Sequence, residues 1–142
     1  MLKINKIRPL RTNMVVTGDR YEEDMYDDHG IIEASKGDLK QYQTVLEVGP
    51  MVRDIKPGDK VMINFMHFAV MQYDKNSLKE DMGMQKIKEF RFNWINLYED
   101  DNTFKECLFI DQQDVTYAFE GKEVQGVKNL IITPGKKIIL GN

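Results

Sequence analysis

The sequence predicts an all-β fold, in the form of a small barrel or sandwich of short strands. Apolar residues recur at every second position in several segments, which is the period of a strand with one buried face. Proline and glycine stand together in turn positions between these segments, at residues 49–50, 57–58 and 134–135. Many short strands separated by such turns are typical of compact β-domains.

Four segments carry this alternation, and residues 115–119 are a fifth, short run of β-rich composition. In residues 60–65, for example, Val61, Ile63 and Phe65 share one face. In residues 89–94 aromatic residues alternate with polar ones, and core packing explains them better than base stacking in an acidic chain. In chain order the segments are residues 43–48 (QTVLEV), 60–65 (KVMINF), 89–94 (EFRFNW), 104–110 (FKECLFI) and 115–119 (VTYAF).

One short helix and one hairpin complete the predicted elements. Ser77 and Glu80 have the spacing of a capping box, and Gly83 limits the helix to about two turns. Residues 55–63 (IKPGDKVMI) and 132–140 (ITPGKKIIL) each place Pro-Gly before an apolar run, which suits a type II turn. The second of these predicts a C-terminal β-hairpin. Its aliphatic residues need a partner surface, on the domain or on a neighbouring subunit.

Length, composition and charge narrow the class of protein. A chain of 142 residues that is 42% hydrophobic and 30% charged has the size of one ordinary domain with a core. No apolar run is long enough to cross a bilayer, and the first ten residues lack the apolar block of a signal peptide. We therefore expect a cytoplasmic protein without a membrane partner. The net charge of -3 predicts that nucleic acid is not a partner either.

Recognisable catalytic and metal-binding patterns are missing from the sequence. Cys107 is the only cysteine, which excludes an internal disulfide and a cysteine cluster for zinc, and its segment predicts a small core residue. His29 and His67 are not spaced with carboxylates or cysteines in a metal-binding pattern. The acidic run at residues 18–28 lacks the spacing of a calcium loop, and a solvated loop explains it better. We therefore predict no enzymatic activity, no cofactor and no metal.

The order of five short motifs resembles that of the GroES co-chaperonin family. An R-P-L segment opens the chain, and a polar loop with Gly-Ile-Ile follows. Then come a strand that ends in V-G, a K-P-G-D turn with its strand, and a closing segment, ECLFIDQQDVTYAF. The resemblance covers residues 6–66 and 106–120, a little over half of the chain. The matching residues are Arg8, Pro9, Leu10, Gly30, Ile31, Ile32, Val45, Leu46, Val48, Gly49, Lys56, Gly58, Asp59, Val61, Leu108, Ile110, Asp114, Val115 and Ala118.

This resemblance implies an irregular GroES-like β-barrel at residues 1–122 that assembles into a homo-oligomeric ring, commonly a heptamer. Such a ring caps the ATP-driven cage of a GroEL-type chaperonin and assists protein folding. The resemblance also implies a mobile loop at about residues 17–42, whose Ile31 and Ile32 insert into an apolar groove of the chaperonin. Gly30 would give this loop its turn, and Glu33 ends the motif. The alternative is that both isoleucines begin a strand packed on the domain.

Several departures from the family pattern bear on function. Glu33 replaces a third aliphatic residue, which implies weaker or altered partner choice. Only residues 50–56 separate Gly49 from Pro57, so the roof hairpin of many family members is absent. The chain adds a long insert at about residues 67–103 and a C-terminal hairpin extension at residues 123–142.

These additions suggest two settings for the protein. An enlarged version without a roof is what we expect of a phage-encoded co-chaperonin that fits a bulky capsid protein into the host's cage, in the host cytoplasm. The alternative is a GroES-like barrel that serves as a structural component of a virion or another large assembly.

Overall fold

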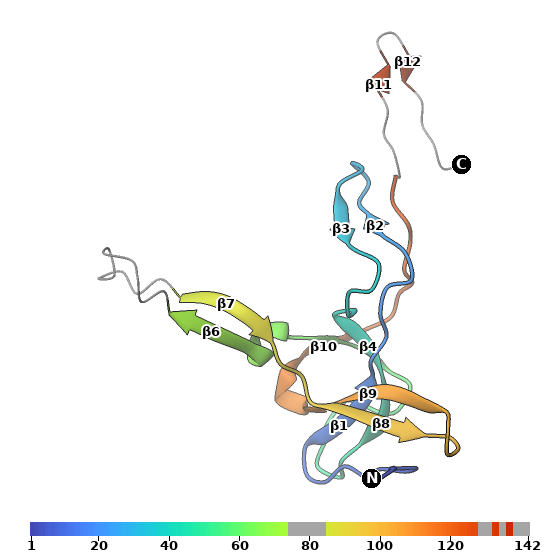
Figure 1. Cartoon of the computed structure of the whole chain (residues 1–142), viewed down its shortest axis with the longest axis vertical. Coiled ribbons are helices and arrows are strands. Elements are labelled where there is room, and N and C mark those ends of the chain that lie inside the picture. The colour runs from blue at the N-terminus through green and yellow to red at the C-terminus, as the bar shows by residue number, and fades with distance from the viewer. Residues whose placement is uncertain (74–84, 128–131, 134–135, 138–142) are drawn as a thin grey trace. The chain divides into compact units, whose positions relative to one another are not determined.

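The computed structural model describes residues 1–73, 85–127, 132–133 and 136–137, and Figure 1 shows the course of the chain. Most of its regular structure is β-strand, and the ladders between its strands are antiparallel. The helical elements among the described residues are two 3-10 turns, η1 (Phe65–Phe68) and η3 (Gln112–Asp114). The predicted all-β class is confirmed. No helix in this described part is long and apolar enough to cross a bilayer.

The chain divides into two compact units. The first, called the sheet unit below, comprises Met1–Gly18 and Gln41–Phe119. The second, called the hairpin unit, comprises Asp19–Lys40 and Glu120–Asn142. Almost all of the loop predicted at residues 17–42 therefore shares one unit with the extension predicted at residues 123–142.

A six-stranded sheet with the order β10-β5-β4-β1-β9-β8 forms the centre of the sheet unit. This order ends at β10 on one side and at β8 on the other, so closure into a barrel stays a prediction. The strands are β1 (Asn13–Thr17), β4 (Tyr42–Val48), β5 (Lys60–Ile63), β8 (Trp94–Tyr98), β9 (Phe104–Asp111) and β10 (Val115–Phe119).

Strand β1 has buried side chains on both of its faces. Met14, Val15 and Val16 are consecutive, so they point alternately to the two faces, and all three are fully buried. The backbone of β1 pairs with β4 along one edge and with β9 along the other, which satisfies its buried N–H and C=O groups. The rest of this core comes from Val45, Val61, Ile63, Cys107, Leu108 and Ile110. The burial of Cys107 confirms its predicted place as a small core residue.

One buried polar pair joins β1 to β4. The Thr17 hydroxyl donates to Gln43 Oε1 at 2.8 Å and accepts from Thr44 N at 2.9 Å. Both Thr17 and Gln43 are buried, and a buried polar group is tolerated when it is hydrogen-bonded. The polar Gln43 therefore belongs to the core face of β4.

The turn between β4 and β5 has the predicted chemistry. Asp59 N donates to Lys56 O at 3.1 Å, and Gly58 between them has a φ of +96°. This geometry matches a type II turn with Pro57 at its second position. The second Pro-Gly pair, at residues 134–135, lies outside the described residues. The strands on either side of it, β11 (Ile132–Thr133) and β12 (Lys136–Lys137), pair antiparallel as the predicted C-terminal hairpin requires.

The insert predicted at residues 67–103 contributes to two sheets. Strands β6 (Ala69–Tyr73) and β7 (Gln85–Phe90) form a separate two-stranded ladder, and β8 extends the six-stranded sheet beside β9 (Figure 1). The single strand predicted over residues 89–94 is wrong, because the chain changes its pairing partner between Phe90 and Trp94. The short helix predicted at residues 77–83 lies outside the described residues.

The break between β7 and β8 contains an aromatic contact. The ring of Phe92 lies 4.9 Å, centre to centre, from the ring of Phe65 and 4.9 Å from that of Phe68. Arg91 N also donates to Phe68 O at 2.7 Å. These contacts connect the break to η1.

In the hairpin unit, the segment predicted as a loop forms a long hydrogen-bonded hairpin. Strands β2 (Met25–Tyr26) and β3 (Ile32–Ala34) pair antiparallel near its tip. Toward its base, Tyr21 N donates to Asp38 O at 2.9 Å and Lys40 N donates to Asp19 O at 3.0 Å. The residues predicted to bind a partner are therefore held on a defined backbone.

Candidate functional site

The predicted site residues lie at the tip of the hairpin formed by β2 and β3. Asp27 N donates to Ile31 O at 2.8 Å, and Gly30 N donates to Asp27 O at 3.2 Å. Gly30 has a φ of +78°, which glycine adopts without strain. A three-residue loop that ends in a glycine of this conformation is a common hairpin connection. Gly30 therefore has the turn-forming place that the sequence predicted for it.

The carboxylate of Asp27 holds this turn together. Its Oδ1 accepts hydrogen bonds from Ile31 N at 2.9 Å and from His29 N at 2.8 Å. These hydrogen bonds, above all the one from Ile31, hold the pKa of the Asp27 carboxyl below its usual range. The tip is therefore built around an ionised carboxylate.

The two isoleucines of the tip are exposed to solvent. Ile31 is 63% exposed and Ile32 is 50% exposed, and Glu33 beside them is exposed as well. Met25, on the opposite strand of the same hairpin, is buried with 6% exposure. Ile32 begins strand β3, but the exposure of both isoleucines contradicts the alternative in which they begin a strand packed on the domain. Gly30, Ile31, Ile32 and Glu33 thus stand together on one tip.

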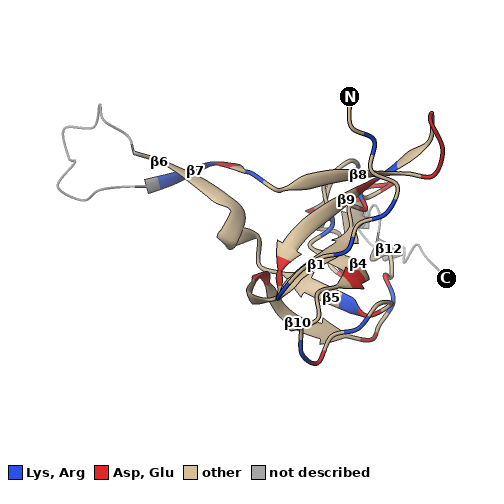
Figure 2. Cartoon of the chain, turned by 90° about the horizontal axis from the view of Figure 1, so that it is seen from below, with Lys and Arg blue, Asp and Glu red and all other residues tan. Residues whose placement is uncertain are grey.

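The segment that carries the tip is acidic in sequence. In the described chain as a whole, Figure 2 shows basic and acidic segments interspersed. Between Arg20 and Lys36, however, the sequence contains no lysine or arginine. The acidic residues of this stretch are Glu22, Glu23, Asp24, Asp27, Asp28 and Glu33. The exposed isoleucines therefore lie in an acidic segment of the chain.

The C-terminal tail pairs with this hairpin, and no pattern in the sequence predicts that contact. Gly126 N donates to Tyr26 O at 3.0 Å, and Val127 N donates to Asp27 O at 3.1 Å. About a hundred residues separate the partners, and residues 120–127 carry neither alternation nor a known motif. No local signal could have revealed this pairing.

A cation joins the base of the hairpin to the same tail. Lys40 Nζ lies 3.0 Å from Glu123 Oε2 and 5.3 Å from the centre of the Tyr21 ring. Burial raises the pKa of the Tyr21 phenol, and the carboxylates of Glu123, Glu33 and Asp38 raise it further. Tyr21 is therefore a neutral phenol at physiological pH and offers Lys40 the face of an uncharged ring.

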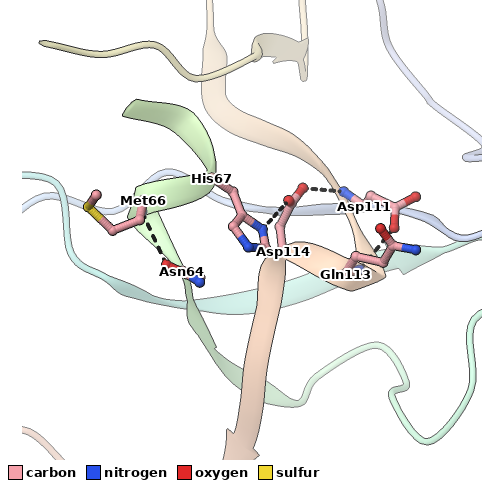
Figure 3. Close-up of polar contacts among 6 residues, drawn as sticks. All are labelled: Asn64, Met66, His67, Asp111, Gln113 and Asp114. Atoms are coloured by element: carbon pink, nitrogen blue, oxygen red, sulfur yellow. Dashed lines mark hydrogen bonds and ion pairs between the residues drawn. The ribbon is translucent and has the colours of Figure 1, made fainter. Parts of the chain in front are cut away.

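A second polar cluster belongs to the sheet unit (Figure 3). His67 Nδ1 lies 2.9 Å from Asp114 Oδ1, although 47 residues separate the two in sequence. Asp114 Oδ2 accepts from Asp111 N at 2.9 Å, and the Asp111 side chain accepts from the backbone N–H of Asp114, which makes a capping box around η3. Asp111 Oδ1 also accepts from Gln113 N at 2.9 Å. These contacts fasten the segment at η1 to the connection between β9 and β10. The described residues contain no group of three His, Cys, Asp or Glu placed to hold a metal ion.

No protein-family model matches this chain, and no curated protein sequence matches it. The resemblance to the GroES family depends on the order of its motifs and stays a prediction. What the structure adds is geometric: the Gly-Ile-Ile motif of that resemblance lies on an exposed, hydrogen-bonded tip.

Proposed function

We propose that this chain is a co-chaperonin subunit whose hairpin tip docks into an apolar groove of a chaperonin ring. The observation that carries the proposal is the exposure of adjacent Ile31 and Ile32 on a tip whose backbone is otherwise hydrogen-bonded. Exposed apolar side chains that stand together commonly mark a binding site for another protein. The place of this motif in the order of the GroES-like motifs supports the same partner.

The energetics of one tip require a ring. Burying one isoleucine contributes about 1.5–3 kcal/mol, and much of the gain from two is offset by the loss of translational and rotational freedom on association. Several identical tips on one ring bind with a high effective concentration, so weak single contacts add up to tight but reversible capping. The proposal therefore includes a homo-oligomeric ring, heptameric as is common in the family, that acts in the cytoplasm.

Native mass spectrometry of the purified protein, alone and mixed with a bacterial chaperonin and ADP, tests this proposal. We expect a ring by itself, and the addition of that ring as one unit to the chaperonin. The double variant Ile31→Ser/Ile32→Ser should form the same ring and lose capture, because it removes only exposed apolar surface. Leu10→Ser is the matched control, since Leu10 is also aliphatic and is 57% exposed, but belongs to the sheet unit.

Two outcomes would contradict the proposal. One is capture of the double variant as tightly as the wild type. The other is a wild-type protein that ignores the chaperonin under conditions in which an ordinary co-chaperonin binds. Unfolding of the double variant would instead mean that the isoleucines support the fold, against their exposure.

One observation favours a second function, as a structural component of a virion or another large assembly. The tail pairs with the hairpin, so that both form one unit, which is suited to serve as an attachment arm. A protein that ignores the chaperonin but is found stoichiometrically in an assembled particle would favour this function over the first.

A further inference from the structure

The side chain of Gln125 binds the outer edge of the hairpin. Its Nε2 donates to Asp24 O at 2.8 Å, and its Oε1 accepts from Tyr26 N at 2.9 Å. One side-chain amide thus satisfies a carbonyl and an N–H of the hairpin backbone, as a neighbouring strand would do. The edge of β2 is covered by the tail at this point.

The next two residues continue the contact toward the tip. Gly126 and Val127 donate from their backbone N–H groups to Tyr26 O and Asp27 O, at 3.0 Å and 3.1 Å. Asp27 is also the residue whose carboxylate binds Ile31 N. The tail therefore reaches the residue that shapes the tip.

Gly126 is required by this close approach. A Cβ atom at this position would lie 2.1 Å from Tyr26 O and 2.3 Å from Asp27 O, both of them backbone atoms. Gly126 does not have the positive φ that Gly30 has, so a left-handed backbone conformation is not the reason for a glycine at this position. Any side chain here forces the tail away from the hairpin.

An ion pair anchors the start of the same segment. Lys40 and Glu123 form their 3.0 Å contact with side chains that are 22% and 33% exposed. A partly sheltered pair is screened less by salt than a fully exposed one. Contacts at residue 123 and at residues 125–127 thus hold the tail along both the base and the upper part of the hairpin.

We infer that residues 123–127 are a strap that holds the hairpin tip in the conformation that presents Ile31 and Ile32. The consequence for binding rests on the proposed function. A tip that is ordered before it docks loses less conformational entropy on docking than a free loop does. The strap therefore raises the affinity of each tip, and releasing the strap weakens every tip of a ring at once.

Hydrogen–deuterium exchange of the full chain tests the strap without any partner. In Gly126→Ala we expect the amides of Tyr26 and Ile31 to exchange about tenfold faster than in the wild type, because local opening of the tip becomes easier. Val124→Ala is the matched control, since it changes the same segment at a side chain that is 67% exposed. The amides of β1 should keep their protection in both variants and show that the sheet unit is folded.

A charge swap tests the anchor separately. Lys40→Glu and Glu123→Lys should each speed exchange at the tip, and the double swap should restore protection. Unchanged exchange of the tip in Gly126→Ala, with β1 protected, would overturn the strap. Faster amide exchange at the tip with undiminished capture by the chaperonin would overturn the role of the strap in binding. Faster amide exchange at the tip of Gly126→Ala, together with a wild type that does not bind any chaperonin, would support the strap and overturn the proposed function.

Discussion

Asp27 organises the hairpin tip in the way that a capping residue organises the start of a helix. One carboxylate oxygen accepts from two backbone N–H groups, those of His29 and Ile31, that the turn leaves without partners in the ladder. The side chain is short enough to reach back over its own turn, which is why aspartate is favoured at such positions. The presentation of the exposed Ile31 thus depends on a single ionised group.

This dependence predicts how the tip responds to acid. Because the pKa of Asp27 is lowered in the folded chain, its contribution to stability is present above the unfolded pKa and is lost as the pH falls through the folded pKa. We expect the tip to be intact at neutral pH and to loosen only below about pH 4. The amide NMR signals of His29 and Ile31, followed from pH 7 to pH 2, measure this change.

Two variants test whether the acid response of the tip comes from Asp27. Asp27→Ala should show the loosened tip at every pH, whereas Asp28→Ala, at the neighbouring exposed carboxylate, should titrate like the wild type. Amide signals that do not respond to acid in the wild type, or that respond equally in Asp27→Ala, would refute this account of the turn.

At the scale of elements, the sequence predicted those strands whose two faces meet different surroundings. Alternation identified β4, β5 and β9 because each has a more buried and a more exposed side along at least part of its length. The β-rich composition of residues 115–119 identified β10. Alternation missed β1, whose run of Met14, Val15 and Val16 is buried on both faces and so does not alternate. Alternation also predicted one strand where the end of β7 and the start of β8 lie. The reason is that Phe92, in the break between these strands, continues the aromatic alternation.

The candidate site was predictable in its residues but not in its structure. The Gly30-Ile31-Ile32 motif could be found because its letters and its place in the chain resemble a known pattern. The hairpin that carries it is polar and is stabilised by turn hydrogen bonds and by a tail segment about a hundred residues away, for which no periodicity exists. The contact of His67 with Asp114 was hidden for the same reason.

The aromatic cluster at the break between β7 and β8 predicts an unequal cost of two similar substitutions. Phe92 is half-buried and its ring has close contacts with those of Phe65 and Phe68. We expect Phe92→Ala to lower the free energy of unfolding of the sheet unit by about 2 kcal/mol, part of the value for a fully buried phenylalanine. Denaturant titration followed by the fluorescence of Trp94, the only tryptophan, measures it.

Phe104→Ala is the control for that substitution. Phe104 is 47% exposed and its ring lies 5.2 Å from that of Tyr98, so we expect a loss below about 1 kcal/mol. Equal losses in the two variants would mean that the cluster around Phe92 does not stabilise the unit.

At the scale of the whole molecule, the two units differ in where their apolar side chains lie. Among the described residues, every buried apolar side chain except Met25 belongs to the sheet unit, whereas the hairpin unit exposes two adjacent isoleucines on a short ladder. Binding residues commonly lie on connections that a stable scaffold carries. Under the proposed function the scaffold has a second task, which is to bring many weak tips together in one ring.

That task predicts how capture depends on the number of intact tips. Rings are assembled by co-refolding wild-type subunits with Ile31→Ser/Ile32→Ser subunits at set ratios, and native mass spectrometry gives their composition. Because the tips of one ring bind cooperatively through effective concentration, we expect capture by the chaperonin to fall much more steeply than the fraction of wild-type subunits. Mixtures with Leu10→Ser subunits at the same ratios should bind like pure wild-type rings. A linear decline with the variant fraction would mean that each subunit binds by itself, and the ring would then have no part in affinity.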